Sequence, residues 1–458
     1  MNDKTTTQTQ HNQEFHPLEE MIKETMERLQ VPGVAIGMLH EGKEYVAGLG
    51  VTNVEHPLPV DSKTLFQIGS LTKTVTGTAV MRLVEMGLLD LDLPLRTYLP
   101  DLKLADEEAA TRVTMRHLLT HTAGWAGDYF DNTGRGDDAL ARIVANMARL
   151  PQLTEPGAFW GYNNAAFYLA GRIIEVLTGK TYEEAVKELV LDALEMSSSC
   201  FFAEEAITHR VAVGHTLQDA TPEVARSWAL PRAAHPAGGL VSCIADLLRY
   251  LHFHMRDGNA SDGESVLTAA SIAQMQTPQL RESFSSSTIG LTWWLREIDG
   301  VRIVEHSGAT MGQQALLLMV PAMHFAIMIL TNATSGGQLC EEVTKWALRH
   351  YLTLSESEII PFDLPVEQLT PYVGQYSDSF TPWEVSIVDD RLMLQILPSS
   401  ARQSGFRLLV PLAFCGEDRV LALDTHFKGT QGDFLRSADG QIKWLRFAGR
   451  IAARHSTL

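Results

Sequence analysis

Ser70 and Lys73 are the first residues in this sequence whose types and spacing could do chemistry. They lie in FQIGSLTKTVTG (residues 66–77), where a glycine precedes the serine and helix-compatible residues follow. Residues three positions apart share a helix face, so hydroxyl and amine can meet. Burial beside the positive end of a helix would lower the pKa of the lysine and let its neutral amine act as a base. The pair indicates an activated serine nucleophile, although a serine that only caps a surface helix would look the same.

Tyr162 and Asn164 form a second group, in EPGAFWGYNNAAFYLAGRIIEVLTG (residues 155–179). They stand on a predicted loop just before an amphipathic helix, so a phenol and an amide can point into one cleft. The tyrosine could relay a proton if a nearby cation lowered its pKa. The alternative is that Tyr162 packs and Asn164 caps the helix.

His306 and Gly308 form a third group, at the end of an apolar strand in VEHSGATMG (residues 304–312). The glycine lets a backbone or a ligand approach closely, and a strand edge exposed there could pair with a substrate amide. A histidine at a strand end is also commonly structural. Each group therefore has a structural explanation when it is taken alone.

Composition and charge exclude several classes of protein. The chain has 458 residues, of which 45% are hydrophobic and 20% charged, and its formal net charge is −18. A chain this acidic has no reason to bind nucleic acid or an anionic membrane. No stretch approaches the roughly 20 apolar residues of a membrane span, and the polar first sixteen residues contain no secretory signal. We therefore expect a cytoplasmic protein with reduced cysteines, no nucleic-acid partner and no membrane association.

The hydrophobic pattern predicts an α+β fold followed by a small all-β domain. After a disordered start (1–14), residues 15–353 predict an antiparallel sheet flanked by helices, with an all-helical subdomain. A polar, proline-punctuated linker (354–365) leads to residues 366–458. Turns every eight to twelve residues there predict a small antiparallel barrel or sandwich.

The order Ser-x-x-Lys, Tyr-x-Asn, His-x-Gly makes the sequence resemble the serine β-lactamase and penicillin-binding-protein superfamily. The similarity covers residues 30–350, through VPGVAIGMLHEGK, VTMRHLLTHTAGW and PAGGLVSCIADLLRY. It is greatest to the class C-like branch of esterases, D-aminopeptidases and D-residue-directed carboxypeptidases. The last ninety residues resemble the lipocalin-like barrel that follows the catalytic domain in some of these enzymes. A β-lactamase/transpeptidase-like fold for residues 15–353 is what the resemblance implies.

The resemblance also implies a role for each motif residue. Ser70 would form an acyl-enzyme, and Lys73 and Tyr162 would move protons, in an order that the sequence leaves open. The other positions would orient the substrate (Asn164, His306 and Gly308) or form the oxyanion hole through backbone N–H groups (Ser70 and Ala309). No metal and no organic cofactor is implied.

The third motif departs from the pattern of true β-lactamases. His306 stands where they carry the lysine of Lys-Thr-Gly, and a histidine holds a carboxylate less surely than an ammonium does. This disfavours β-lactam hydrolysis and favours the esterase and peptidase branch.

We expect a serine hydrolase that acts on amide or ester bonds of small peptides or related acyl substrates, with peptidase or amidase activity as the leading hypothesis. A carboxylesterase or lactonase is the first alternative. The others are an acyltransferase or peptide cyclase of the penicillin-binding-protein-type thioesterase kind, and a non-catalytic binding protein of the same fold. The sequence leaves homo-oligomerisation open.

Two further features near the motifs have simpler interpretations. His117 and His121 lie four residues apart in RHLLTHTAGW (residues 116–125), but no third zinc ligand is in register. The resemblance places them at a buried helix end, so we expect structural histidines. Four aromatic side chains could either line the cleft or pack in the core: Trp125, Tyr129, Phe130 and Trp160.

Overall fold

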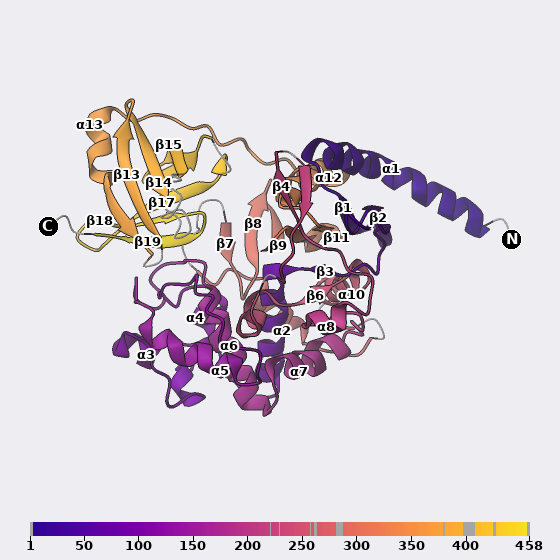
Figure 1. The fold of residues 1–458 in the computed structure, drawn as a ribbon, viewed down its shortest axis with the longest axis horizontal. Helices are drawn as coiled ribbons and strands as arrows, with labels where there is room; N and C mark the ends of the chain where they lie inside the picture. The colour runs from indigo at the N-terminus through magenta and orange to yellow at the C-terminus, as the bar shows by residue number, and fades with distance from the viewer. Residues whose placement is uncertain are drawn as a thin grey trace.

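The computed structural model contains a β-sheet, a helical region and a separate β-barrel, which lie side by side (Figure 1). It describes residues 3–219, 221–228, 230–256, 258–260, 263–280, 287–378, 381–396, 408–424 and 427–455. The part up to Leu352 is called the main domain below. It combines an antiparallel sheet with helices, which confirms the predicted α+β fold class.

A seven-stranded antiparallel sheet forms the centre of the main domain, in the order β2-β1-β11-β10-β9-β8-β7. Its strands are β1 (Gly33–His40), β2 (Lys43–Gly50), β7 (Ser287–Ile289), β8 (Trp294–Ile298), β9 (Val301–Thr310), β10 (Gln313–Val320) and β11 (Phe325–Thr331). Strand β11 is buried along its whole length because helices cover both faces of the sheet. Continuous apolar runs in the sequence are the consequence.

Two long helices cover one face of this sheet. They are α1 (Asp3–Leu29) and α12 (Gly336–Leu352), and they share a core with the strands. Helix α1 begins at Asp3, so it extends over most of the stretch for which disorder was expected. Leu18, Ile22 and Val343 are fully buried in the core that these helices make with β1 and β11.

The opposite face carries the helical region, whose centre is α2 (Thr72–Glu85). The other helices are α3 (Glu107–Arg112), α4 (Met115–Leu119), α5 (Ala139–Asn146), α6 (Asn164–Thr178), α7 (Tyr182–Val186), α8 (Ala203–Ala206), α9 (His235–Gly238), α10 (Ile244–Met255) and α11 (Ala269–Met275). The main domain also contains two short ribbons, β3 (Phe66–Gln67) with β6 (Val241–Ser242) and β4 (His215–Gln218) with β5 (Thr221–Val224). No helix in the described part of the chain has the length and apolarity to cross a membrane.

Helix α2 is polar in sequence and yet buried. The hydroxyls of Thr74, Thr76 and Thr78 donate to backbone carbonyls three or four residues earlier, at 2.8, 3.1 and 3.0 Å. Because these bonds satisfy the hydroxyls inside the helix, the threonines can be buried without an unpaired donor. This explains how a helix that begins with Thr-Lys-Thr lies in the middle of the core.

The last part of the chain is a closed eight-stranded barrel, which confirms the predicted barrel and excludes the sandwich. Its strands are β12 (Gly374–Ser377), β13 (Pro382–Val388), β14 (Arg391–Ile396), β15 (Leu408–Gly416), β16 (Arg419–Ala422), β17 (Gln431–Arg436), β18 (Ile442–Phe447) and β19 (Arg450–Arg454), after the short helix α13 (Val366–Leu369). Pairing of β12 with β19 closes it around its own apolar core. Phe362, within the predicted linker, already pairs with Phe414 of β15.

The barrel docks on the main domain through strand β18. Arg446 is buried, and its guanidinium makes a bidentate ion pair with Asp433 while donating to the carbonyl of Trp160 at 2.8 Å. The indole of Trp444 donates to the carbonyl of Leu153 at 2.9 Å. The barrel is thereby joined to the loop that precedes α6.

We predict that Arg446→Ala lowers the free energy of unfolding by about 3 kcal/mol, because it leaves the Asp433 carboxylate without its cation in a mostly buried place. Urea unfolding measures this loss. Lys443→Ala, at an exposed position of the same strand, is the control and should change stability by less than about 0.5 kcal/mol. Equal effects of the two substitutions would contradict the docking role of Arg446.

Candidate active site

Ser70 lies in a short helical turn, η1 (Gly69–Leu71), that leads into α2. Gly69 has a φ of +52°, and a Cβ there would lie 2.6 Å from the backbone nitrogen of Ala309. A Cβ on Gly308 would lie 1.9 Å from the carbonyl oxygen of Ile68 and 2.9 Å from the nitrogen of Ser70. Glycine at both positions therefore lets β9 touch the backbone of the turn. The backbone nitrogens of Ser70 and Ala309 both lie at this junction, and the oxyanion hole that the resemblance implies for them stays a prediction.

Lys73 is fully buried, and its Nζ donates to Ser70 Oγ at 3.0 Å and to the carbonyl oxygen of Ala237 at 2.6 Å. Burial, helped by the positive charge of Arg450, holds the pKa of Lys73 well below its usual value. The amine is then neutral over a range of pH in which an exposed lysine is charged. A neutral amine at this distance from Ser70 Oγ is compatible with the predicted role of Lys73 as a base, and that role stays a prediction.

Tyr162 lies beside this amine, with Lys73 Nζ 4.9 Å and Arg450 Cζ 4.6 Å from the centre of its ring. Burial raises the pKa of Tyr162 to about 12, although the Ser70 hydroxyl and the Arg450 charge oppose this rise. The phenol is therefore protonated at neutral pH, which suits a proton donor better than a base. Between the two candidates for the first base, these charges favour Lys73.

His306 is buried on the cleft side of β9. Its Nδ1 donates to the carbonyl oxygen of Ser307 at 2.6 Å, so Nε2 carries the lone pair. Burial and the nearby Lys73 lower the pKa of His306 to about 3. The ring is neutral at neutral pH and presents no positive charge to a substrate carboxylate.

The end of β9 also offers backbone groups to the cleft. Pairing of β8 with β9 runs only from Ile298↔Val301 to Trp294↔Glu305, whereas β10 pairs with β9 as far as Thr310. Residues 306–310 thus have a strand partner on one side in the described structure. The other edge lies at the Ser70 turn, where an extended substrate could add a strand.

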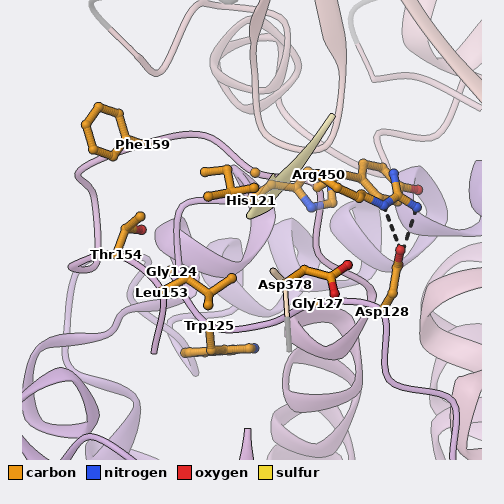
Figure 2. A pocket seen from close by; sticks show the side chains of 13 residues that line it. His121, Gly124, Trp125, Gly127, Asp128, Leu153, Thr154, Phe159, Asp378 and Arg450 are labelled. Atoms are coloured by element: carbon orange, nitrogen blue, oxygen red, sulfur yellow. Dashed lines mark hydrogen bonds and ion pairs between the residues drawn. The ribbon is translucent and has the colours of Figure 1, made fainter. Parts of the chain in front are cut away.

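Asn164 is the first residue of α6, and its Nδ2 donates to Asp128 Oδ1 at 2.8 Å. Arg450 binds the same carboxylate, through Nε to Oδ2 at 2.7 Å and a second N–H to Oδ1 at 3.3 Å (Figure 2). The amide nitrogen of Asn164 thus contacts Asp128, and the role of Asn164 in orienting Lys73 remains a prediction.

Asp128 and Arg450 are the site residues that sequence reasoning missed. Asp128 belongs to an acidic loop, and Arg450 begins barrel strand β19, beyond a turn at Gly449. The Gly449 carbonyl accepts the backbone N–H of Tyr162 at 2.8 Å, which brings the barrel hairpin to the nucleophile. No local motif marks either residue, because only the docking of the barrel joins them to the site.

The resulting cleft has a volume of about 450 Å³ and is lined by both domains. The main domain contributes Ser70, Trp160, Tyr162, Ser287, Trp294, His306, Ser307, Gly308, Ala309 and Gln314, and the barrel contributes Thr430, Gln431, Ala448, Gly449 and Arg450. Trp160 therefore lines the cleft, whereas Trp125 lines a smaller cavity behind Tyr162 (Figure 2). Phe130 is exposed, and Tyr129 donates its hydroxyl to Asp131.

The two histidines near the motifs bind backbone groups. His117 Nδ1 accepts the backbone N–H of Thr114 at 3.1 Å, and His121 Nδ1 accepts that of Asn163 at 2.9 Å. Neither belongs to the cluster of potential metal ligands in the described residues, which is Glu14, His40 and Glu41 on the far side of the sheet.

Comparisons with known proteins place the chain in a family. The family model described as Beta-lactamase matches residues 18–349. Penicillin-binding protein 4 of Amycolatopsis lactamdurans is 38% identical over 308 residues, which are 66% of this chain and 81% of that protein. Unguisins hydrolase ungD of Aspergillus violaceofuscus is 24% identical over 344 residues, 69% of this chain and 61% of that protein. The chain therefore belongs to the β-lactamase family of serine hydrolases.

Solved structures share the fold. A crystal structure of SurE with D-Leu superposes with a TM-score of 0.78 at 23% identity, over 97% of this chain and all of SurE, so the likeness includes the barrel. The octameric penicillin-binding protein homologue from Pyrococcus abyssi has a TM-score of 0.65 at 26% identity, over 95% of this chain and 99% of that one. A class C β-lactamase from Rhodobacter sphaeroides has a TM-score of 0.60 at 21% identity, over 72% of this chain and 99% of that one.

We predict that Lys73→Met raises the free energy of unfolding at pH 7, and raises it less at pH 10. Unfolded lysine holds its proton up to about pH 10.4, whereas burial lowers the pKa of folded Lys73. Folded Lys73 therefore holds its proton less tightly than unfolded Lys73, and the cost of this difference to stability fades as the pH rises to the unfolded pKa. Urea unfolding at both pH values measures the difference.

The control for this prediction is Lys63→Met, which removes an exposed lysine. It should show no comparable dependence on pH. A gain for Lys73→Met that is the same at pH 7 and pH 10 would contradict a neutral, buried Lys73.

We predict that Arg450→Gln lowers the turnover rate at pH 7 and moves the acid limb of the rate–pH profile to higher pH. The Arg450 charge helps to lower the pKa of Lys73, so its loss raises that pKa and leaves less neutral amine at pH 7. Arg454→Gln, on the same strand but with its guanidinium near Tyr376, is the control. An unshifted acid limb in Arg450→Gln would refute the electrostatic role of this arginine.

Proposed function

We propose that this member of the β-lactamase family cleaves amide bonds of small peptides or related acyl substrates through an acyl-enzyme on Ser70. The observation that carries the proposal is the 3.0 Å contact between Ser70 Oγ and the fully buried amine of Lys73. A neutral amine at that distance can take the hydroxyl proton. The cleft beside it is large enough for a short peptide segment.

The first half of the reaction follows from these positions. Lys73 takes the proton of Ser70 as Oγ attacks the carbonyl carbon, and the negative oxygen is held by the backbone N–H groups of Ser70 and Ala309. Losing one such donor typically costs about 10²–10³ in kcat. As the tetrahedral intermediate collapses, Tyr162 gives its proton to the leaving nitrogen and is reprotonated from the Lys73 ammonium. The amine product leaves, and the acyl group stays on Ser70.

The second half reverses these proton transfers. Water, or a second amine, attacks the acyl carbon and gives a proton through Tyr162 to Lys73, and Ser70 Oγ then leaves with the proton of the Lys73 ammonium. Peptide cyclisation would use an amine of the same acyl chain at this step. Hydrolase and acyltransferase functions thus share one site and differ only in the acceptor.

Peptide substrates are favoured over β-lactams and simple esters by two observations. His306 is neutral, so the third motif lacks the charge that would hold a β-lactam carboxylate. The edge of β9 at residues 306–310 can pair with a peptide backbone, which an ester such as a lactone lacks. Two of the relatives support this choice, since one is named a hydrolase of unguisins and SurE was crystallised with D-Leu, whereas the names of two others refer to penicillin binding and β-lactamase activity.

Three other expectations from the sequence remain alternatives. A carboxylesterase or lactonase would show a larger advantage of ester over amide substrates than chemical reactivity explains. A peptide cyclase would form a cyclic product from a linear peptide ester. A homo-oligomer is proposed only from the octameric relative, and light scattering on the purified chain tests it.

We predict that Ser70→Ala abolishes turnover, by at least about 10⁴-fold, and abolishes labelling by a fluorophosphonate probe. Intact-mass spectrometry should show one probe adduct on the wild-type protein. Ser355→Ala, which removes an exposed serine after α12, should label like wild type. An unlabelled wild-type protein that is folded by circular dichroism would instead support the non-catalytic binding protein.

A further inference from the structure

His121 stands out among the buried residues behind the cleft. It follows α4 with a φ of +56°, a left-handed conformation that costs about 1 kcal/mol or more for a histidine. Its side chain is 1% exposed. A residue that only ends a helix would be glycine or asparagine at much lower cost. The imidazole therefore needs another explanation.

Three contacts of His121 surround Tyr162. The carbonyl oxygen of His121 accepts the N–H of Gly161 at 2.9 Å, and its Nδ1 accepts the N–H of Asn163 at 2.9 Å. Its ring stacks on the Tyr162 ring, with the centroids 4.5 Å apart and the planes at 24°. The His121 backbone thus binds the residue before Tyr162, while its imidazole binds the residue after Tyr162 and covers one face of the phenol.

The protonation of His121 follows from the same contacts. Because Nδ1 accepts a hydrogen bond, the proton of the neutral ring lies on Nε2. Burial, with Lys73, His306 and Arg450 nearby, holds the pKa of His121 well below its usual range. The ring stays neutral at working pH. We therefore assign it no proton transfer in the reaction, and it acts only through its position.

His121 also lines a small cavity between the two domains. The cavity, of about 30 Å³, is lined among others by His121, Asp128, Asp378 and Arg450 (Figure 2). Nε2 has no hydrogen-bond partner among the described residues. The volume suffices for one water molecule between the imidazole and the acidic groups. A buried donor of this kind typically costs about 1–3 kcal/mol when it is unsatisfied, a cost that an asparagine in the same place would avoid.

We propose that His121 is a positioning residue that holds the Tyr162 phenol where it can protonate the leaving nitrogen. The proposal rests on the proposed function and names a part of that site. It predicts different effects on amide and ester substrates, which a purely structural role of His121 would not. Amide cleavage needs a proton on its leaving group, whereas p-nitrophenolate leaves without one. Misplacing Tyr162 should therefore slow amides and spare activated esters.

The experiment compares kcat/KM for an aminoacyl p-nitroanilide and the matching p-nitrophenyl ester in wild type and His121→Asn. The asparagine oxygen can replace Nδ1 as the acceptor for Asn163 N–H and tolerates the positive φ, so the variant should fold, and only the ring is lost. We expect anilide cleavage to fall about 10- to 100-fold, with ester cleavage within threefold. The ratio of ester to amide rates should rise accordingly.

Two further variants make the test specific. Tyr162→Phe should give the same selective loss, and the double variant His121→Asn/Tyr162→Phe should lose little beyond it, because both changes act through one phenol. His117→Asn alters a histidine on the same segment whose Nδ1 serves the cap of α4, and it should leave the ratio unchanged.

The outcomes separate this proposal from the one on which it rests. Equal losses on amide and ester, no loss on either, or additive effects in the double variant would overturn the positioning role, while Ser70 labelling by fluorophosphonate upholds the proposed function. A wild-type protein without a Ser70 adduct would overturn both. Circular dichroism and thermal unfolding of each variant show that the comparison is made on folded protein.

Discussion

The buried amine of Lys73 is the constraint on which the rest of the site depends. A lysine without exposed surface has to be neutral or paired, and Lys73 has only Ser70 Oγ and a backbone carbonyl as partners at hydrogen-bond distance among the described residues. Helices α2, α6 and α9 close around it, and the threonines of α2 satisfy their own hydroxyls so that this packing is possible. Burial of Lys73 lowers the stability of the fold but keeps the amine neutral at neutral pH, and such losses of stability are common at functional sites.

The barrel is a part of the site. Its hairpin at Gly449 binds the backbone of Tyr162, and Arg450 is the one arginine or lysine among the described residues that line the cleft. Asp128 balances the charge of Arg450 and connects it to Asn164. The protonation states of Lys73 and Tyr162 are therefore set by both domains, which gives the appended barrel a physical role beyond covering the cleft.

Sequence patterns were sufficient for the elements and for the motif residues. Turns every eight to twelve residues predicted the small all-β domain at the C-terminus, and the hydrophobic pattern before it predicted an antiparallel sheet flanked by helices. Gly308 was expected to let a backbone or a ligand approach closely, and the structure shows such a contact between β9 and the Ser70 turn, where Gly69 is needed as well. Arg450 and Asp128 could not be found in this way, since a barrel arginine and a loop aspartate become site residues only through docking.

His121 was expected to be structural, and only its stacking on Tyr162 indicates a further role. The helix over residues 3–14 escaped prediction because that stretch is polar throughout.

The most direct test of the account is the charge state of Lys73 itself. Carbon-13 NMR of lysine side chains, in protein labelled at the ε-carbon, reports each ammonium group, and Lys73→Arg identifies the signal by its loss. The account predicts that the Lys73 signal at pH 7 is that of a neutral amine, while exposed lysines lose their proton only near pH 10.4. A Lys73 signal that is charged at pH 7 and titrates with the exposed lysines would contradict the central claim that burial makes this residue the base for Ser70.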